Sequence, residues 1–193
     1  GSTRMGRIVG VTVAERFGKS LLELGGNNAI IITPTADLKV VVPGAVFGAV
    51  GTAGQRCTST RRLIIHESVY DKVRDAIIGA YGQLTIGNPL DERFHIGPLI
   101  DIDAVNMYLS AIERAKAEGG KVLVEGGVLE GEGYESGCYV KPTIIEAKNN
   151  FEIVQHETFA PVLYLMKYSG DVENAIEQQN GVVQGLSSAI MTN

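Results

Sequence analysis

The sequence predicts an α/β fold in which a mostly parallel sheet carries helices on both faces. Segments with strand-like and helix-like patterns alternate along the chain, which is the element order of repeated βαβ units. Residues 29–33 and 162–168 are apolar on both faces, as strands of a parallel sheet are when helices cover both of its sides. The crossovers between such strands are expected to be right-handed.

The composition narrows the class of protein. The chain has 193 residues, of which 45% are hydrophobic and 20% are charged, enough for one sizeable folded domain. The net charge of −5 gives no electrostatic support for binding nucleic acid or an anionic membrane. The uncharged stretch 40–55 is shorter than the roughly 20 residues of a spanning helix. Two cysteines, Cys57 and Cys138, are too few for a disulfide framework, so we expect reduced thiols and a cytoplasmic location.

The first half of the chain is expected to alternate helices with short strands. Ser2 or Thr3 can cap the first helix, and Ser68 can cap the third. Pro43 would bend the second helix or set its start. The expected elements are a helix over residues 4–17, strands over 21–24 and 29–33, a helix that begins at Thr35 or Asp37, a strand over 61–66 and a helix from Ser68 to about residue 84.

The second half continues the alternation and is interrupted by glycines. Gly119 and Gly120 are expected to end a helix, and residues 126–137 form a glycine-rich connection. The expected elements are a helix from Asp101 or Asp103 to about Glu118, strands over 121–125 and 162–168, an extended segment over 139–145, a helix over 172–179 and a final strand over 187–192. Because the chain begins with Gly and ends on a strand, we expect it to be part of a longer protein.

Cys57 is the residue whose surroundings best suit chemistry. It follows the run Gly-Thr-Ala-Gly (residues 51–54) and stands directly after Arg56. A neighbouring cation lowers the pKa of a thiol, and glycines let backbone approach a ligand closely. The hydroxyls of Thr58 and Ser59 could donate to the sulfur. A buried, inert cysteine is the alternative interpretation.

Two carboxylates have surroundings that suggest a role. Glu23 is the only charged residue of the segment 21–26. Burial there would raise its pKa towards neutrality, which suits a general base; alternatively, Glu23 faces solvent while its neighbours face the core. Glu157 could accept two hydrogen bonds from a ribose diol, and the ring of Phe159 could pack beside another ring. For the segment of Glu157 and Phe159, the alternative is a polar loop before a strand.

The remaining candidate side chains carry no recognisable motif. A cysteine hydrolase would pair a histidine with Cys57, but His66, His95 and His156 are each interpreted as surface or capping residues. No pair of them has metal-ligand spacing, and the chain has no Cys-x-x-Cys, so no metal site is predicted. Cys138 lies in a glycine-rich connection and is interpreted as structural.

In combination, the motifs resemble those of the aldehyde dehydrogenase superfamily. Each motif is weak alone, whereas four in the family order at about the family spacing are specific, and the resemblance covers the whole chain. The motifs are Gly-Ser-Thr at 1–3, Glu-Leu-Gly-Gly at 23–26, Gly-Gln-Arg-Cys at 54–57 and Glu-Thr-Phe-Ala-Pro-Val at 157–162. The run Leu-Glu-Leu-Gly-Gly-Asn-Asn at 22–28 is similar to the antiquitin branch, family 7, which oxidises α-aminoadipic semialdehyde in lysine breakdown.

The resemblance implies roles for these residues. Cys57 would add to the aldehyde carbon to give a thiohemiacetal, with its own N–H as half of the oxyanion hole. Glu23 would activate the water that hydrolyses the thioester left after hydride transfer to NAD. Arg56, with Thr58, would meet the substrate carboxylate, unless Arg56 serves only to tune the thiol. The implied cofactor-binding residues are Ser2 near the pyrophosphate, Leu24 near the carboxamide, Gly25, Glu157 on the nicotinamide ribose and Phe159 beside it.

The resemblance also implies a domain division and an assembly. Residues 1–24 would be the tail of the dinucleotide-binding domain and residues 25–193 an incomplete catalytic domain, so the chain alone is expected to show little dehydrogenase activity. The complete protein is expected to act on a small aldehyde as a homotetramer. Two alternatives from other classes are a cofactor-independent thiol esterase or acyltransferase, and a non-catalytic fragment.

Overall fold

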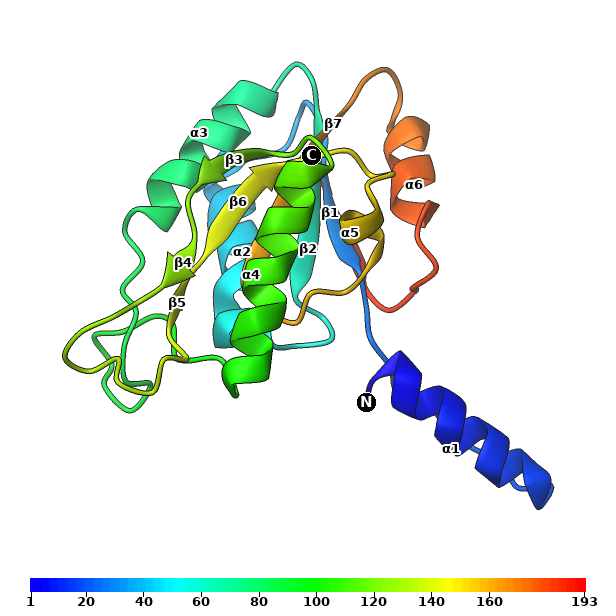
Figure 1. Ribbon diagram of the computed structural model, residues 1–193. Coiled ribbons are helices and arrows are strands. Elements are labelled where there is room, and N and C mark those ends of the chain that lie inside the picture. The colour runs from blue at the N-terminus through cyan, green and yellow to red at the C-terminus, as the bar shows by residue number, and fades with distance from the viewer.

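The computed structural model describes residues 1–193 and confirms the α/β fold with a mostly parallel sheet (Figure 1). The helices are α1 Thr3–Glu15, α2 Leu38–Val50, α3 Tyr70–Tyr81, α4 Ile102–Ala117, α5 Glu152–Gln155 and α6 Val172–Asn180, with a 3₁₀ turn, η1, over Gly51–Gly54. The strands are β1 Asn28–Ile32, β2 Thr60–His66, β3 Lys121–Val124, β4 Gly127–Val128, β5 Val140–Lys141, β6 Thr143–Glu146, β7 Val162–Tyr168 and β8 Ser188–Met191.

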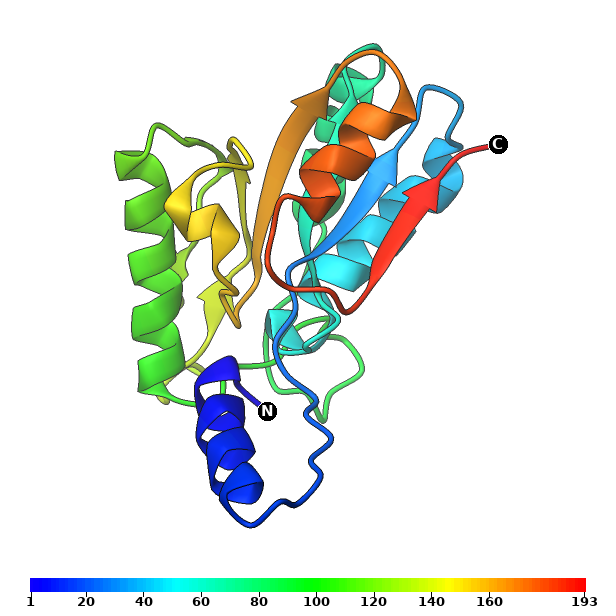
Figure 2. The same cartoon turned by 90° about the vertical axis from the view of Figure 1, so that its right-hand side faces the viewer.

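One six-stranded sheet organises the molecule, in the order β3-β6-β7-β2-β1-β8. All neighbouring strands are parallel except β3, which pairs antiparallel with β6. Helices α2 and α3 pack on one face, and α4, α5 and α6 cover the other (Figures 1 and 2). The central strands β1 and β2 are therefore buried on both faces, which suits the apolar runs Ile30–Ile32 and Leu63–Ile65 within them. None of the helices has the length and apolarity that crossing a membrane would require.

Three of the expected helix starts can be checked at their caps. The side chains of Ser2, Asp37 and Asp101 each accept a hydrogen bond from a first-turn N–H, which confirms them as N-caps. The cap expected at Ser68 is wrong: its hydroxyl bonds to the His66 ring, and α3 begins at Tyr70 without a side-chain cap. Pro43 lies inside α2 rather than at its start.

The first 24 residues stand away from the sheet (Figure 2). The apolar stripe of α1 is exposed, including Ile8 and Val11. The strand expected over residues 21–24 is wrong, because no neighbouring strand pairs with this segment and it runs as extended chain. Its only backbone tie is the amino group of Gly1, which donates to the carbonyl of Glu23 at 2.8 Å.

The parallel arrangement gathers several loops at one edge of the sheet. Because β1, β2, β7 and β8 run in the same direction, the segments that precede them meet at the amino-terminal edge. These segments are residues 23–27, 54–59, 157–161 and 185–187. Three of the predicted motifs are therefore close together in space although they lie far apart in the sequence.

Candidate functional site

The loop that carries Cys57 begins with unusual backbone geometry. Thr52 and Ala53 both have φ of 53°, and Gly54 has φ of 69°. A left-handed conformation costs a non-glycine residue roughly 1–2 kcal/mol, so it persists only where the surroundings enforce it. A Cβ on Gly54 would overlap the carbonyl of Ala160. The loop is thus packed directly against the segment that follows Glu157.

Cys57 itself is exposed at the turn that ends this loop. Its carbonyl oxygen accepts a hydrogen bond from Asn28 Nδ2 at 2.7 Å, and no acceptor in the chain meets its N–H. The hydrogen bond considered from Ser59 to the sulfur is not formed: Ser59 is buried, and its hydroxyl bonds to the N–H of Arg56 at 3.1 Å. Thr58 is exposed beside Cys57. The thiol is therefore accessible, so the burial in the alternative interpretation is wrong, while the reactivity of Cys57 stays a prediction.

The side chain of Arg56 turns away from the thiol. Its guanidinium carbon lies 5.0 Å from the ring centroid of Phe47, and Nη2 donates to the Phe47 carbonyl at 3.4 Å. Phe47 is itself largely exposed on α2, so this contact lies near the surface. The substrate-binding roles of Arg56 and Thr58 stay predictions.

Glu157 is held against the Gly25–Gly26 turn. Its Oε1 accepts a hydrogen bond from the N–H of Gly26 at 3.1 Å and lies 3.9 Å from Arg61 Nη2. A Cβ on Gly25 would overlap the Glu157 carboxylate, and one on Gly26 would overlap the carbonyl of Cys57. The two glycines therefore allow the carboxylate, the turn and the Cys57 loop to pack together.

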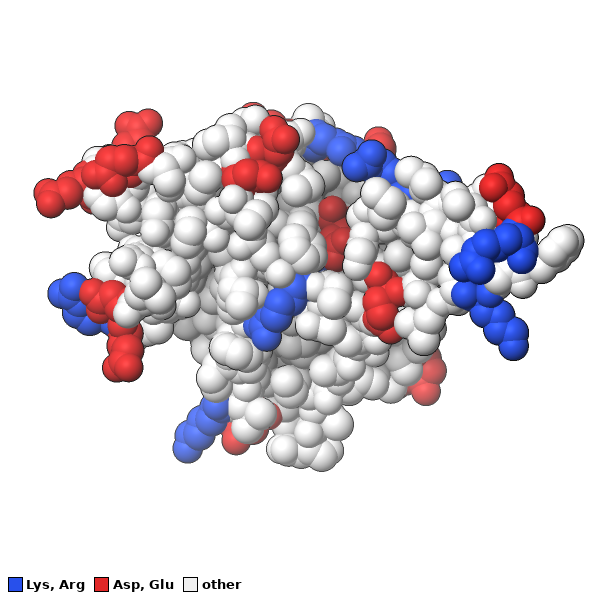
Figure 3. Space-filling model, turned by 90° about the horizontal axis from the view of Figure 1, so that it is seen from below, with Lys and Arg blue, Asp and Glu red and all other residues white.

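A cleft of about 740 Å³ opens beside this turn. Four of the predicted site residues line it: Glu23, Leu24, Gly25 and Glu157. The rest of the lining is Thr3, Arg7, Leu22, His156 and residues 183–186. Cys57 does not line the cleft, although its carbonyl oxygen lies close to Gly26. Figure 3 looks onto this end of the molecule, where acidic and basic side chains are scattered over a mostly uncharged surface without a continuous patch of either sign.

Glu23 lies in the cleft but is not buried. Its side chain is exposed and forms no hydrogen bond or ion pair, so the predicted burial is wrong. The alternative is right that Glu23 faces solvent but wrong that its neighbours face the core, because Leu21 and Leu22 are also exposed. The physical reason is the missing strand partner of residues 21–24, which leaves the segment without a cover. Its role as a base stays a prediction.

The other two predicted cofactor residues lie outside the cleft lining. The hydroxyl of Ser2 accepts the N–H of Met5 at 3.2 Å and so caps α1. The ring of Phe159 packs beside Arg61, whose guanidinium carbon is 5.6 Å from the ring centroid. Their cofactor-binding roles also stay predictions.

Sequence reasoning missed two buried side chains at the centre of the site, Arg61 and Asn28. Arg61 Nη1 donates to the carbonyls of Gly54 and Ala160, at 2.8 and 3.1 Å, and Nη2 donates to that of Arg56 at 3.1 Å. Burial lowers the pKa of Arg61 to about 10, an effect that Glu157 partly opposes, so the guanidinium is charged at neutral pH. The signal in the sequence was two arginines at the start of an otherwise apolar strand.

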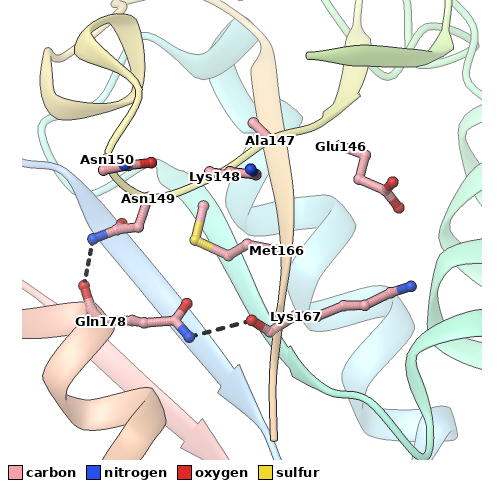
Figure 4. A pocket seen from close by; sticks show the side chains of 8 residues that line it. All are labelled: Glu146, Ala147, Lys148, Asn149, Asn150, Met166, Lys167 and Gln178. Carbon is pink, nitrogen blue, oxygen red and sulfur yellow. Dashed lines mark hydrogen bonds between the residues drawn. The ribbon is translucent and has the colours of Figure 1, made fainter. Parts of the chain in front are cut away.

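A second hollow, of about 430 Å³, lies at the opposite end of the sheet, where β6 and β7 end (Figure 4). Two of its polar side chains bond within the chain: Asn149 Nδ2 donates to the Gln178 carbonyl, and Gln178 Nε2 donates to the Lys167 carbonyl. The ammonium of Lys167 lies over the Tyr70 ring, 4.3 Å from its centroid. None of the motif residues contributes to this hollow.

Comparisons with known proteins find the family that the motifs resemble. The model of the "Aldehyde dehydrogenase family" matches residues 1–193. The chain is 51% identical over its whole length to "Alpha-aminoadipic semialdehyde dehydrogenase" of Rattus norvegicus, of which it covers 35%. It is 50% identical to "Aldehyde dehydrogenase family 7 member A1" of Pisum sativum, of which it covers 37%. The chain thus spans about a third of the length of these relatives.

The fold comparison reaches the same group of proteins. Betaine aldehyde dehydrogenase from Staphylococcus aureus, solved in complex with NAD⁺, superimposes with a TM-score of 0.95. That similarity covers 100% of this chain and 38% of the other, at 29% sequence identity. HpcC from Thermus thermophilus superimposes with a TM-score of 0.94 at 30% identity, with 100% and 38% covered.

Proposed function

The chain belongs to the aldehyde dehydrogenase family, and from this premise we propose that it supplies the nucleophile and the hydrolytic base of an NAD-dependent aldehyde dehydrogenase. The observation that carries the proposal is the meeting of three motifs at the Gly25–Gly26 turn. Glu157 bonds to the N–H of Gly26, and the carbonyl of Cys57 lies against the same glycine. The thiol of Cys57 is exposed, and Glu23 lines the cleft on the Glu157 side of the same turn, although Cys57 itself does not line that cleft.

The chemistry begins at the Cys57 sulfur. The thiolate adds to the aldehyde carbon, so that a C–S bond forms and the carbonyl electron pair moves onto oxygen. The Cys57 N–H, which has no acceptor in the chain, donates to that oxygen. The chemistry that NAD⁺ supplies when bound is hydride acceptance, which oxidises the carbon held on Cys57 to a thioester.

Glu23 completes the reaction as a general base. It removes a proton from the water that attacks the thioester carbon, the C–S bond breaks, and the carboxylic acid leaves while the thiol of Cys57 is restored. Because hydride leaves for the cofactor, this chemistry needs no histidine partner for the thiol. Exposure of Glu23 to the cleft gives the water a route to it.

The residues present fit a dinucleotide at the cleft. Leu24, Gly25 and Glu157 line it, and only a glycine at position 25 leaves room beside the carboxylate. We assign Glu157 to the nicotinamide ribose, because an ionised carboxylate accepts two hydrogen bonds from a diol. Ser2 is assigned to the pyrophosphate and Phe159 to the neighbourhood of the ring.

We propose α-aminoadipic semialdehyde as the substrate, because the relative from Rattus norvegicus at 51% identity carries that name. Arg56 is assigned to its carboxylate, with Thr58 beside it. The contact that Arg56 now makes with Phe47 is exposed and worth roughly 0.5–1 kcal/mol. A bidentate pair with a carboxylate is stronger, so the substrate can draw the guanidinium away from Phe47.

The organisation of the complete protein is proposed from the family. Residues 1–24, which stand away from the sheet, are assigned to the dinucleotide-binding domain and residues 25–193 to the catalytic domain. We assign the parent protein to lysine catabolism, to the cytoplasm and to a homotetramer. Because the chain spans 35% of its relative, we expect the 193-residue chain alone to form little NADH.

The test uses the complete parent protein and the isolated chain. We expect the parent to form NADH from α-aminoadipic semialdehyde and NAD⁺, and Cys57→Ala to abolish this while NAD⁺ still binds. Aldehyde-dependent NADH formation by the isolated chain at the parent's rate would contradict the domain assignment. Ester hydrolysis through Cys57 that is indifferent to NAD⁺, without any NADH formation by the parent, would instead establish a thiol esterase.

A further inference from the structure

We propose that Arg61 and Asn28 are positioning residues that fix the two peptide groups on either side of Cys57 and so direct its N–H outward beside its sulfur. The proposal deepens the proposed function and rests on Cys57 as the nucleophile. The two side chains come from β2 and β1, so the sheet itself would hold the nucleophile.

The peptide between Arg56 and Cys57 is fixed by Arg61. The carbonyl of Arg56 accepts hydrogen bonds from Arg61 Nη2 at 3.1 Å and from the N–H of Ser59 at 3.0 Å. Arg61 is 2% exposed and is anchored by the carbonyls of Gly54 and Ala160. In a trans peptide the N–H points opposite to the C=O. Since the Arg56 carbonyl points inward, the N–H of Cys57 points away from the interior.

The following peptide is fixed by Asn28. Its Nδ2 donates to the carbonyls of Cys57 at 2.7 Å and Ser59 at 2.8 Å. Its Oδ1 accepts the N–H of Ser187 at 3.1 Å, and the residue is 4% exposed. A buried amide whose donors and acceptor are all used has little freedom to turn. Both peptides around Cys57 are therefore held from the interior, while its side chain stays exposed.

The sequence neighbours of these residues provide matched controls. Asn27 is equally buried, but its Nδ2 donates to the Val154 carbonyl in α5. Arg62 is also buried, and it donates to the Asn27 carbonyl and to the Gln178 carbonyl at the end of α6. Neighbouring residues of a strand point to opposite faces. One member of each pair thus contacts the Cys57 loop and the other contacts the helices.

The experiment follows the backbone N–H of Cys57 directly. Selective ¹⁵N-cysteine labelling of the chain gives two backbone signals, from Cys57 and Cys138, and Cys138 reports whether the fold is intact. We expect Asn28→Asp and Arg61→Lys to shift or broaden the Cys57 signal and to leave the Cys138 signal in place. Asn27→Asp and Arg62→Lys should leave the Cys57 signal unmoved.

A chemical readout accompanies the spectra. We expect the rate of Cys57 alkylation by iodoacetamide, relative to Cys138 in the same chain, to fall severalfold in Asn28→Asp and Arg61→Lys only. Unchanged Cys57 signals and ratios in both variants would overturn the proposal, as would equal effects of the two control variants. Loss of the Cys138 signal in both Asn28→Asp and Arg61→Lys would also overturn the proposal, because Asn28 and Arg61 would then be needed for folding of the whole domain.

The outcome separates this proposal from the proposed function. A Cys57 signal that responds as expected, in a protein whose parent forms no NADH, would keep the positioning role and reject the dehydrogenase. A parent that forms NADH while the Cys57 signal ignores both variants would do the reverse.

Discussion

The loop that carries Cys57 and the segment that carries Glu23 differ in how the rest of the molecule holds them. The Cys57 loop is tied by buried side chains from two strands and is packed against the Glu157 loop. The Glu23 segment has no strand partner and is tied through the amino group of Gly1. The comparison teaches that motifs of equal strength in a sequence can have very unequal support in the fold.

The largest expected effect concerns the supported loop. Arg61→Ala leaves three carbonyls of the Cys57 and Glu157 loops without a charged donor. We expect the free energy of unfolding to fall by about 3–5 kcal/mol, measured by urea denaturation. Arg4→Ala is the control, because Arg4 is exposed on α1, and it should change stability by no more than about 0.5 kcal/mol. Equal effects of the two variants would remove the contrast between interior and surface arginines.

The second prediction concerns the left-handed backbone conformation of residues 52–54, at the start of the Cys57 loop. Gly54→Ala places a Cβ against the Ala160 carbonyl at a φ of 69°, and we expect a loss of about 2–4 kcal/mol. Thr52→Gly should act in the opposite direction, because it removes the backbone strain of a β-branched residue at φ of 53°. We expect it to leave the free energy of unfolding unchanged or to raise it by up to about 1 kcal/mol. Calorimetric melting of both variants checks the pair, and a destabilised Thr52→Gly chain would argue against strain.

The third prediction concerns the pH dependence of stability, which depends on the buried side chain of Tyr108. Burial raises the pKa of Tyr108 from 10.0 to about 12, so the folded state keeps its proton where the unfolded state has lost it. The resulting stability is fully present below pH 10 and is lost as the pH rises to about 12. Two pKa units correspond to about 2–3 kcal/mol. Tyr108→Phe should therefore lose less stability than the wild-type chain over this range, and parallel pH curves for the two would contradict the assignment.

The same contrast explains what could be predicted from the sequence. The central strands and the caps at Asp37 and Asp101 follow from local patterns, and the structure confirms them. The strand over residues 21–24 was wrong because apolar alternation does not reveal whether a neighbouring strand is present.

The sequence predicted part of the candidate site but not the side chains that support it from the interior. Motifs indicated Cys57, Glu23 and Glu157, but the buried donors Arg61 and Asn28 were missed. Their partners are backbone carbonyls, and those of Cys57 and Ala160 lie far away in the sequence from Asn28 and Arg61, respectively. A bond to a backbone carbonyl requires no particular residue type at the partner position, so it leaves no short motif. Side chains that act on a ligand can be recognised by type and spacing, whereas those that act on backbone depend on the tertiary fold.

The smallest effect on stability is expected for Glu23→Gln, although this substitution should slow steady-state turnover. Glu23 forms no side-chain hydrogen bond and is exposed, so Glu23→Gln should change the free energy of unfolding by less than about 0.5 kcal/mol. In the complete parent, however, it removes the base for thioester hydrolysis. We expect a first turnover of NADH at the wild-type rate, followed by a steady-state rate about 10²-fold lower, with the acyl group on Cys57 detected by mass spectrometry. Glu15→Gln, also exposed but outside the cleft, should leave both phases unchanged. If Glu23→Gln turned over normally, another group would have to activate the water, and the poorly supported segment would have no part in the chemistry.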